Sequence, residues 1–481
     1  MGLNILLVTL DQFRGDALSC AGHPVVKTPN LDRLAEEGVR FARHYSQAAP
    51  CGPGRASLYT GLYQMNHRVV ANGTPLDTRF DNVAKAARRA GYVPTLFGYT
   101  DQAMDPREAE GPQDPRLSSY EGILPGFEEG LHLPEGNPAA WVGWLKERGH
   151  ALPDEAKAVI AGEPERPAEH SMAAFLTDRF LGWLGRQEKP WFAHVSHLRP
   201  HPPYAAAGRF AKLYDPDAMP MPIAPADARH RLHDGLLRER AFAAPKDEAA
   251  MRRLTSQYFG MVSETDFQLG RIFEALEARD QWNDTFIVIT SDHGEHLGDH
   301  GLLQKGGFFE SSYHVLCVVR DPQGRKGAVL DAFSENVDVF PTLCDAMGVP
   351  VPAQCDGLPL TPFLKGETPP FWRDAAHWEY DWRAGFIAKK PHSWPWDRRL
   401  ERQNLAVRRD RDSAFIHFAD GTSLCFDLAA DSSWRTEARD PAFVLKKAQA
   451  MLSWRAQHTE RTLSDMLTQD GGIGRWPDIR G

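Results

Sequence analysis

The 481-residue sequence lacks the features that define disulfide-rich, zinc-binding and nucleic-acid-binding proteins. Its six cysteines are scattered and include no C-x-x-C pair, which excludes a disulfide framework and a zinc knuckle. The formal net charge is -9, whereas a nucleic-acid surface requires clustered lysine and arginine. We therefore expect no nucleic-acid partner, while a local basic pocket for a small anionic substrate remains compatible with this charge.

Long apolar runs are also missing. No uninterrupted stretch is long enough to cross a bilayer, so we expect no membrane association. The first ten residues lack the basic start of a signal peptide, and Asp11 follows too soon for one. Leu6 stands where an N-myristoylation motif requires serine or threonine. Together with the scattered cysteines, these absences predict a cytoplasmic protein.

Short apolar runs that alternate with helical patterns are present instead. Residues 5–10 form a near-continuous apolar run, which is typical of a strand buried on both faces of a parallel sheet. Thr28 is the predicted N-cap of a helix that has Pro29 at its first position and ends at Gly38. Residues 263–278 have an amphipathic pattern that predicts a helix with Phe267 on its buried face. Further strands are predicted at 93–98, 191–196 and 286–290.

This alternation predicts an α/β fold with a mainly parallel sheet flanked by helices. We expect residues 1–372 to form one catalytic domain, interrupted by an irregular insertion at about 101–169 that is rich in proline, glycine and charge. Residues 373–455 are predicted to form a small α+β subdomain with antiparallel strands and a final helix. Residues 456–481 are a tail that could dock on a partner subunit.

The most informative motif is C-x-P-x-R, in the segment Cys51-Gly-Pro-Gly-Arg-Ala-Ser-Leu. In an arbitrary sequence this pattern is most often a buried, reduced cysteine in a turn that caps a helix. Here it follows a strand that ends in Asp11 and a T-P-N-L-D-x-L helix. Arg55 lies one helical turn after Cys51, where it can offset anionic charge.

Two polar pairs, Asp11-Gln12 and Asp292-His293, each follow a predicted strand. Ligands of open α/β sheets bind outside the carboxyl ends of the strands, so the two pairs can converge there. Two carboxylates, an amide oxygen and an imidazole nitrogen are suitable ligands for one divalent ion. Either pair alone would more often be a helix cap at a strand end.

Together these motifs resemble the type I sulfatase branch of the alkaline phosphatase superfamily, and most closely its phosphonate monoester hydrolases. Further matches are Met65-Asn-His-Arg, Arg199-Pro-His-Pro-Pro and Ser291-Asp-His-Gly-Glu. The resemblance implies an alkaline-phosphatase-like fold and hydrolysis of phosphonate monoesters, phosphate diesters and sulfate monoesters. It also implies that a maturation enzyme oxidises Cys51 to formylglycine, whose hydrate has one hydroxyl to attack the ester and another to expel the product.

The resemblance further implies that residue 51, Asp11, Gln12, Asp292 and His293 bind one divalent metal ion. Many sulfatases have a second aspartate and an asparagine where this sequence has Gln12 and His293. An imidazole ligand admits Mn²⁺ or Zn²⁺ beside Ca²⁺, and we expect Mn²⁺ first, then Ca²⁺, then Zn²⁺. Relatives form oligomers through C-terminal segments, which predicts a homodimer or homotetramer.

Three more residues receive roles from the same resemblance. His201 matches a histidine beside the leaving-group oxygen, and Lys305 matches a lysine that contacts the transferred group and that oxygen. Asn72 matches a polar substrate contact. For each of them the alternative is that it is a solvated residue or a turn residue without a role in the reaction.

The segment Gly98-Tyr-Thr-Asp departs from typical arylsulfatases, which have G-K-W-H here. Losing that lysine weakens the demand for a highly charged substrate and favours a monoanionic diester or phosphonate monoester. We interpret Asp101 as the base that takes the proton from the second hydroxyl of the hydrate. Tyr99 is either a substrate contact or a packing residue at the end of a strand.

Three alternatives stay open from sequence alone. The nearest is a dedicated arylsulfatase on the same scaffold. A phosphodiesterase or phosphomutase relative would usually have serine or threonine where Cys51 stands, and a binding protein that has lost activity would not need the intact metal and cation set. A second metal site at His296 and His300 is disfavoured, because Gly298 weakens a helix between them.

Overall fold

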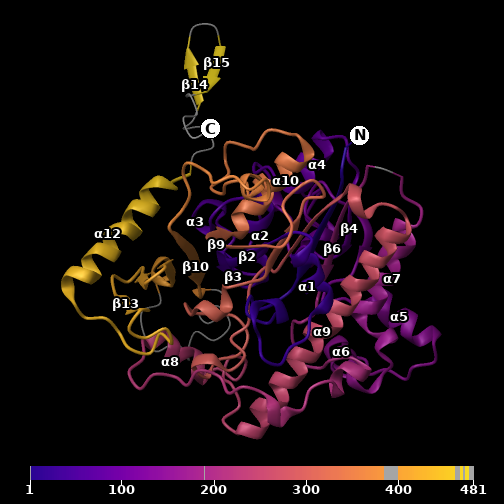
Figure 1. Ribbon diagram of the computed structural model, residues 1–481, viewed down its shortest axis with the longest axis horizontal. Coiled ribbons are helices and arrows are strands. Elements are labelled where there is room, and N and C mark those ends of the chain that lie inside the picture. Colours follow the sequence, from indigo (N-terminus) through magenta and orange to yellow (C-terminus); the bar gives the residue numbers. More distant parts are fainter. Residues whose placement is uncertain (1, 189, 384–398, 461–465, 470–471, 476–481) are drawn as a thin grey trace.

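The computed structural model describes residues 2–188, 190–383, 399–460, 466–469 and 472–475 (Figure 1). Its main sheet has eight strands in the order β5-β4-β6-β1-β7-β8-β2-β9. Strand β8 runs antiparallel to β7 and β2, and the other neighbours pair in parallel. The strands are β1 (Asn4–Leu10), β2 (Val39–Tyr45), β4 (Pro94–Gly98), β5 (Glu128–His132), β6 (Phe192–His197), β7 (Thr285–Thr290), β8 (Cys317–Arg320) and β9 (Ala328–Glu335).

Helices cover both faces of this sheet. Alternate residues of β1 point to opposite sides, so Leu6 and Val8 join one hydrophobic core while Ile5 and Leu7 join the other. On the first side lie α1 (Pro29–Glu36), α5 (Ala139–Glu147), α6 (Ala156–Ala161), α7 (Met172–Leu184) and α9 (Glu248–Ala278). On the second lie α2 (Cys51–Thr60), α4 (Val83–Arg89), α10 (Val339–Met347) and α11 (Thr361–Leu364).

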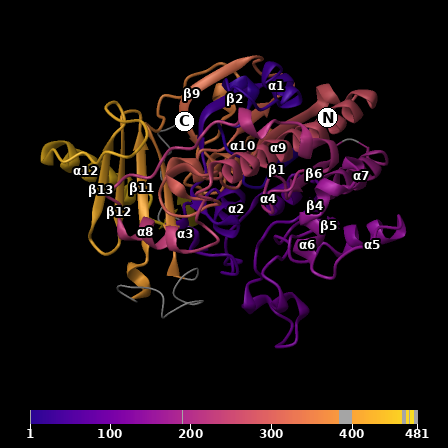
Figure 2. The same cartoon turned by 90° about the horizontal axis from the view of Figure 1, so that it is seen from below.

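A second, five-stranded sheet stands beside this body (Figure 2). Its order is β13-β12-β11-β10-β3, and all pairs are antiparallel except that of β3 with β10. The strands are β3 (Ala48–Ala49), β10 (Ala375–Asp381), β11 (Asn404–Asp410), β12 (Ser413–Phe418) and β13 (Ser423–Asp427), and α12 (Pro441–Gln457) packs on them. These two sheets confirm the predicted fold class, and the boundary at residue 372 stays a prediction.

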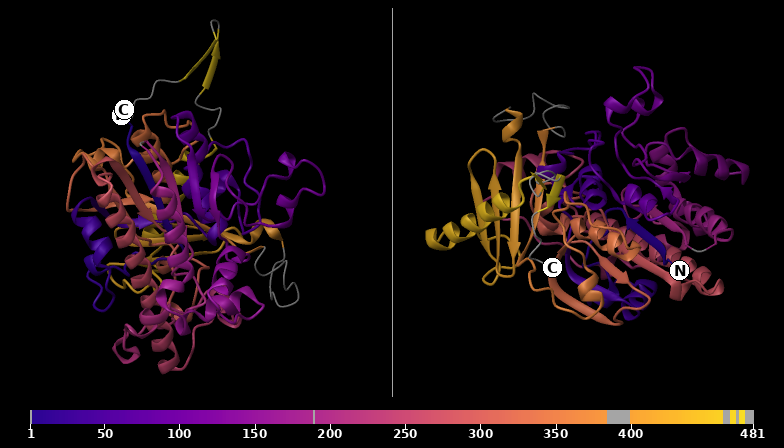
Figure 3. Two further views of the ribbon diagram at one scale, coloured as in Figure 1. Left: turned by 90° about the vertical axis from the view of Figure 1, so that its right-hand side faces the viewer. Right: turned by 90° about the horizontal axis from the view of Figure 1, so that it is seen from above.

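The tail contains two short strands among its described residues. Strands β14 (Met466–Gln469) and β15 (Gly472–Arg475) pair antiparallel and project away from the two sheets (Figure 3). The remaining α-helices of the described residues are α3 (Gln64–His67) and α8 (Arg231–Arg238). Within the described ranges, none of the helices combines the length and the apolar character that crossing a bilayer requires.

The segment 101–169 is more regular than its composition predicts. It contains β5, which pairs in parallel with β4 at the edge of the main sheet, and the helices α5 and α6. Trp141 and Leu145 of α5 and Ile160 of α6 are fully buried in the core beneath them. Their helices are too short for periodicity to stand out among the surrounding proline, glycine and charged residues.

Two predicted helices also differ in detail. Thr28 precedes α1, but its hydroxyl contacts Ser19 and Asp32 instead of capping the helix, which ends at Glu36. Gly38 follows the helix where a Cβ would lie 2.5 Å from the Val319 carbonyl oxygen, so a close approach of two chains explains this glycine. Helix α9 begins at Glu248, fifteen residues before the predicted start, and Phe267 is 42% exposed instead of buried.

Candidate active site

Cys51 is the first residue of α2, separated from β3 by Pro50 alone, and its side chain is buried. The helix start packs tightly against the end of β7, because a Cβ on Gly54 would lie 2.5 Å from the Asp292 carbonyl oxygen. The amide of Gly52 donates to Asn72 Oδ1 over 2.8 Å. The second sheet and the start of α2 therefore fix residue 51 at the carboxyl ends of the central strands.

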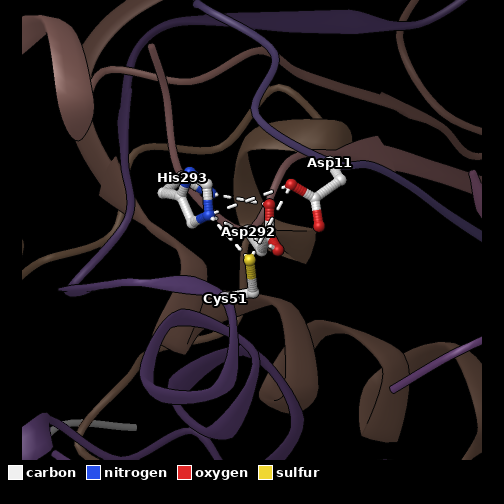
Figure 4. A group of neighbouring side chains, drawn as sticks. All are labelled: Asp11, Cys51, Asp292 and His293. Carbon is white, nitrogen blue, oxygen red and sulfur yellow. Dashed lines mark hydrogen bonds and ion pairs between the residues drawn. The ribbon is translucent and has the colours of Figure 1, made fainter. Parts of the chain in front are cut away.

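Four side chains converge at this edge of the sheet (Figure 4). Asp11 follows β1, Asp292 and His293 follow β7, and their ligand atoms lie with Cys51 Sγ within 4.8 Å of one another. His293 Nε2 is 3.3 Å from Cys51 Sγ and 3.9 Å from Asp11 Oδ1. The pairing Thr9↔Ser196 and Thr9↔Thr290 aligns the strand ends, which is why residues so distant in sequence meet here.

This group fits a divalent metal ion. Two buried carboxylates and an imidazole nitrogen form an oxygen-rich donor set. His293 Nδ1 lies 3.0 Å from the Gly294 carbonyl oxygen, so Nδ1 donates its proton and Nε2 is left free to bind an ion. Burial and the negative charge of Asp11 raise the pKa of the Cys51 thiol.

Arg55 holds the two carboxylates of the group together. Its Nε donates to Asp292 Oδ2 over 2.9 Å, and its Nη2 donates to Asp11 Oδ2 over 3.2 Å. Its Nη1 donates to Ser196 Oγ and to the Tyr99 carbonyl oxygen. Burial opposes the charge on Arg55, but its neighbours outweigh that cost and raise its pKa, so the guanidinium stays positive.

Tyr99 is buried against the same charges. Its hydroxyl donates to Asp11 Oδ2, and the Arg55 guanidinium lies 4.2 Å from the centre of its ring. Burial acts to raise the pKa of Asp11, whereas the positive charges of Lys305 and Arg55 lower it well below its usual value. The observed partners of Tyr99 are thus Asp11 and Arg55.

Gln12 and Lys305 form a second polar connection at the site. Gln12 has a positive φ of 67°, and its Oε1 accepts a hydrogen bond of 2.7 Å from Lys305 Nζ. Gln12 Nε2 donates to the buried carboxylate of Glu295. Burial lowers the pKa of Lys305, but the negative charges of Asp11 and Asp292 outweigh this effect and raise it above its usual value.

His201 lies within electrostatic range of Asp11 and Lys305. Burial, with Lys305, lowers the pKa of His201 to about 3, so its ring is neutral at physiological pH. Its Nδ1 lies 2.6 Å from the Pro202 carbonyl oxygen and donates to it, so the neutral ring has Nε2 as an acceptor.

Asp101 lies beside the start of α2, where a Cβ on Gly52 would lie 3.3 Å from the Asp101 carbonyl oxygen. Its backbone is in the left-handed region with φ 50°, and its side chain is 6% exposed. Burial raises the pKa of its carboxyl to about 7, while Arg55 acts in the opposite direction. Asn72 is exposed, and its side chain contacts the start of α2 through Gly52.

Several contacts were not predictable from motifs. Ser196 at the end of β6 binds Arg55, and Glu295, given no role by the sequence, binds Gln12. His296 uses both ring nitrogens in hydrogen bonds to Ser311, Ser312 and Gly306, and His300 stacks on Phe309 at 3.6 Å. Among the described residues, the group around Cys51 alone has the spacing of a metal site.

Comparison with known proteins agrees with this geometry. The curated multifunctional alkaline phosphatase superfamily protein PehA of Trinickia caryophylli is 38% identical over 98% of both chains. The crystal structure of the phosphonate monoester hydrolase of Agrobacterium radiobacter is 42% identical and superposes with a TM-score of 0.91, covering 99% of this chain and 100% of that chain. The phosphonate monoester hydrolase SpPMH of Silicibacter pomeroyi is 33% identical, with a TM-score of 0.90 over 98% and 99% of the two chains.

The family model described as Sulfatase matches residues 3–349, which include every residue of the site described above. The resemblance predicted from the motifs around Cys51 and Asp292 is therefore confirmed. This chain belongs to the sulfatase family.

Proposed function

We propose that this protein hydrolyses phosphonate monoesters, and also phosphate diesters and sulfate monoesters, with formylglycine formed from Cys51 as its nucleophile. The observation that carries the proposal is the position of Cys51 Sγ at the start of a buried helix, within 4.8 Å of the ligand atoms of Asp11, Asp292 and His293. Its similarity to two phosphonate monoester hydrolases along almost the whole chain supports the substrate class.

Asp11, Gln12, Asp292, His293 and an oxygen of residue 51 would hold one divalent ion, for which we propose Mn²⁺ before Ca²⁺ and Zn²⁺. The ion would supply positive charge next to the reacting oxygens. Oxidation of Cys51 by a separate maturation enzyme, a cytoplasmic location and a homodimer or homotetramer belong to the same proposal.

In the first step, one hydroxyl of hydrated residue 51 gives up its proton to solvent water, and its oxygen forms a bond to phosphorus or sulfur as the bond to the ester oxygen breaks. Arg55 and Lys305 stabilise the added negative charge, and each such fixed donor contributes about 10²-fold to 10³-fold in rate. Lys305 gives a proton to the departing oxygen, because neutral His201 uses its ring proton on Pro202. His201 lies beside that oxygen as a hydrogen-bonding partner.

In the second step, Asp101 removes the proton of the remaining hydroxyl of residue 51. The C=O bond of the aldehyde then forms while the C–O bond that joins residue 51 to the phosphonate, phosphate or sulfate group breaks, and the group leaves as an anion with that oxygen. Water adds to the aldehyde and restores the hydrate, so no water attacks phosphorus or sulfur directly. Asn72 is a proposed substrate contact, and Tyr99 supports Asp11 through its hydroxyl.

The ratio of two specificity constants tests the substrate class. We expect a higher kcat/KM for phenyl phenylphosphonate than for an aryl sulfate, because Gly98-Tyr-Thr-Asp places no lysine cation near the transferred group. The alternative, a dedicated arylsulfatase, is the function of more distant relatives such as the arylsulfatase of Clostridium perfringens, which is 26% identical. A ratio that favours the aryl sulfate would replace our proposal by this alternative.

Lys305→Ala should lower kcat/KM by about 10²-fold to 10³-fold on an ester with a poor leaving group. The loss should be smaller on a nitrophenyl ester, since a nitrophenolate leaves without a proton. A series of esters with rising leaving-group pKa measures this as a steeper dependence in the variant than in the wild type. Equal losses across the series would show that Lys305 does not donate the proton.

The pH profile tests the role of Asp101. A base must be ionised, so product release should slow as pH falls through the pKa of this carboxyl, which burial raises to about 7. A cation held by Asp11 and Asp292 would offset part of their negative charge and so lower the pKa of Asp101. The acidic limb of the pH profile, where the rate falls, should therefore lie at or below about pH 7. Asp101→Asn should remove the limb and lower kcat, and an unchanged profile and rate in this variant would exclude the role.

A further inference from the structure

Glu295 lies at a junction of four chain segments beside the site, and its side chain is fully buried. Its Oε1 accepts hydrogen bonds from the backbone amides of Leu297 and Gln304. Its Oε2 accepts from the Tyr204 hydroxyl over 2.9 Å and from Gln12 Nε2. A carboxylate with four donors around it is fixed in place and presents only acceptor atoms to Gln12.

The other end of the Gln12 amide has the opposite kind of partner. Gln12 Oε1 lies 2.7 Å from Lys305 Nζ, which can only donate. The Gln12 main chain is held as well, since its N–H donates to Asp292 Oδ1 over 3.2 Å and its carbonyl accepts from Tyr258 over 2.8 Å. The two ends of the amide thus select the same orientation independently of each other.

We propose that Glu295 is a positioning residue that fixes the polarity of the Gln12 amide, so that its oxygen faces Lys305 and the metal-binding group. The inference rests on the proposed function, in which Gln12 supplies an oxygen to the metal ion. If the amide turned over, Nε2 would point at Lys305 and at the cation, where two donors and a cation repel one another. Partners of this kind, one step removed from a metal, contribute about 10-fold to 100-fold in metal affinity.

Replacing the hydrogen-bond acceptor that faces Gln12 at position 295 by a donor tests the proposal. In Glu295→Gln the amide oxygen can keep the bonds to Leu297 and Gln304, but its NH₂ then faces Gln12 and turns that amide over. In the double variant Gln12→Glu/Glu295→Gln, a carboxylate at 12 accepts from that NH₂ and again presents an oxygen to Lys305. Tyr204→Phe is the matched control, because it removes one bond to Glu295 without changing the polarity at Gln12.

The measurement is the affinity of the metal-free, full-length protein for Mn²⁺, titrated in competition with a chelating dye. Glu295→Gln should bind Mn²⁺ about 10-fold to 100-fold more weakly than the wild type, Tyr204→Phe should bind about as well as the wild type, and the double variant should recover the loss. Gln12→Glu alone places two carboxylates against each other, so it should bind more weakly than the double variant despite its extra negative charge.

A double variant that binds no better than Glu295→Gln would overturn the inference, and so would a loss in Tyr204→Phe equal to that in Glu295→Gln. Thermal unfolding shows whether Glu295→Gln folds. If it does not, the double variant tests the proposal by itself, because the proposal requires it to fold and to bind Mn²⁺. Absence of Mn²⁺ binding by the wild type would instead count against the metal site of the proposed function. If the wild type binds Mn²⁺ and Glu295→Gln binds it with the same affinity, only the positioning role of Glu295 is contradicted.

Discussion

Cys51→Ser should trap the reaction after one step. Serine supplies a single hydroxyl, which can bond to phosphorus or sulfur but leaves no second hydroxyl on the same carbon to expel the product. We therefore expect a stable ester on residue 51, one per active site, and a loss of turnover of at least about 10⁴-fold, because the second step is blocked. Intact-protein mass spectrometry after incubation with an aryl phosphonate measures the added group.

Cys51→Ala is the control, because it should be equally inactive and carry no added group. The side chains of both variants differ little in size from cysteine, and the start of α2 is fixed by backbone contacts through Gly52 and Gly54. Both variants should therefore fold like the wild type. Continued turnover by Cys51→Ser would mean that water attacks the bound group directly, and the two-hydroxyl mechanism would be wrong.

Arg55→Met should remove both stability and activity. Methionine fills similar space without charge, so Asp11 and Asp292 are left as buried carboxylates without their shared cation. Removing one partner of a buried ion pair costs about 3–5 kcal/mol in the free energy of unfolding. Denaturant unfolding of the metal-free protein measures this loss, and bound metal should offset part of it because the ion supplies the missing charge.

Arg55→Lys separates charge from geometry. Lysine keeps one positive charge, but a single ammonium cannot contact Asp11, Asp292, Ser196 and the Tyr99 carbonyl oxygen together. We expect it to recover much of the stability, while kcat/KM remains about 10²-fold below the wild type. A stable Arg55→Met, with the unfolding free energy of the wild type, would show that Arg55 does not balance the two carboxylates.

The sequence is most informative where local pattern and covalent order determine position. Asp11 and Asp292 each follow a buried apolar strand, and parallel strands bring such residues to one edge of the sheet. Arg55 follows Cys51 by one helical turn, which directs both side chains to the same group. These rules are enough to predict the fold class and the convergence of Asp11, Asp292 and His293, whereas the family resemblance was needed to add Cys51 to the group.

Contacts between distant segments are less accessible to this reasoning. The pairing of β3 with β10 joins Ala48 to Glu379, and neither segment carries a signal for the other. The role of Glu295 depends on Tyr204, Gln304 and Gln12, which meet only after folding. Similarly, the helices within 101–169 owe their stability to burial of Trp141 and Leu145, and their short patterns do not reveal it.

The state of residue 51 is the most direct test of the central claim. Trypsin releases the fragment from His44 to Arg55, and its mass distinguishes an aldehyde or its hydrate from a thiol. In protein from its native host, we predict the aldehyde or hydrate at position 51 in the active fraction. A fragment found only as an alkylatable thiol, in protein that still turns over substrate, would contradict the formylglycine mechanism.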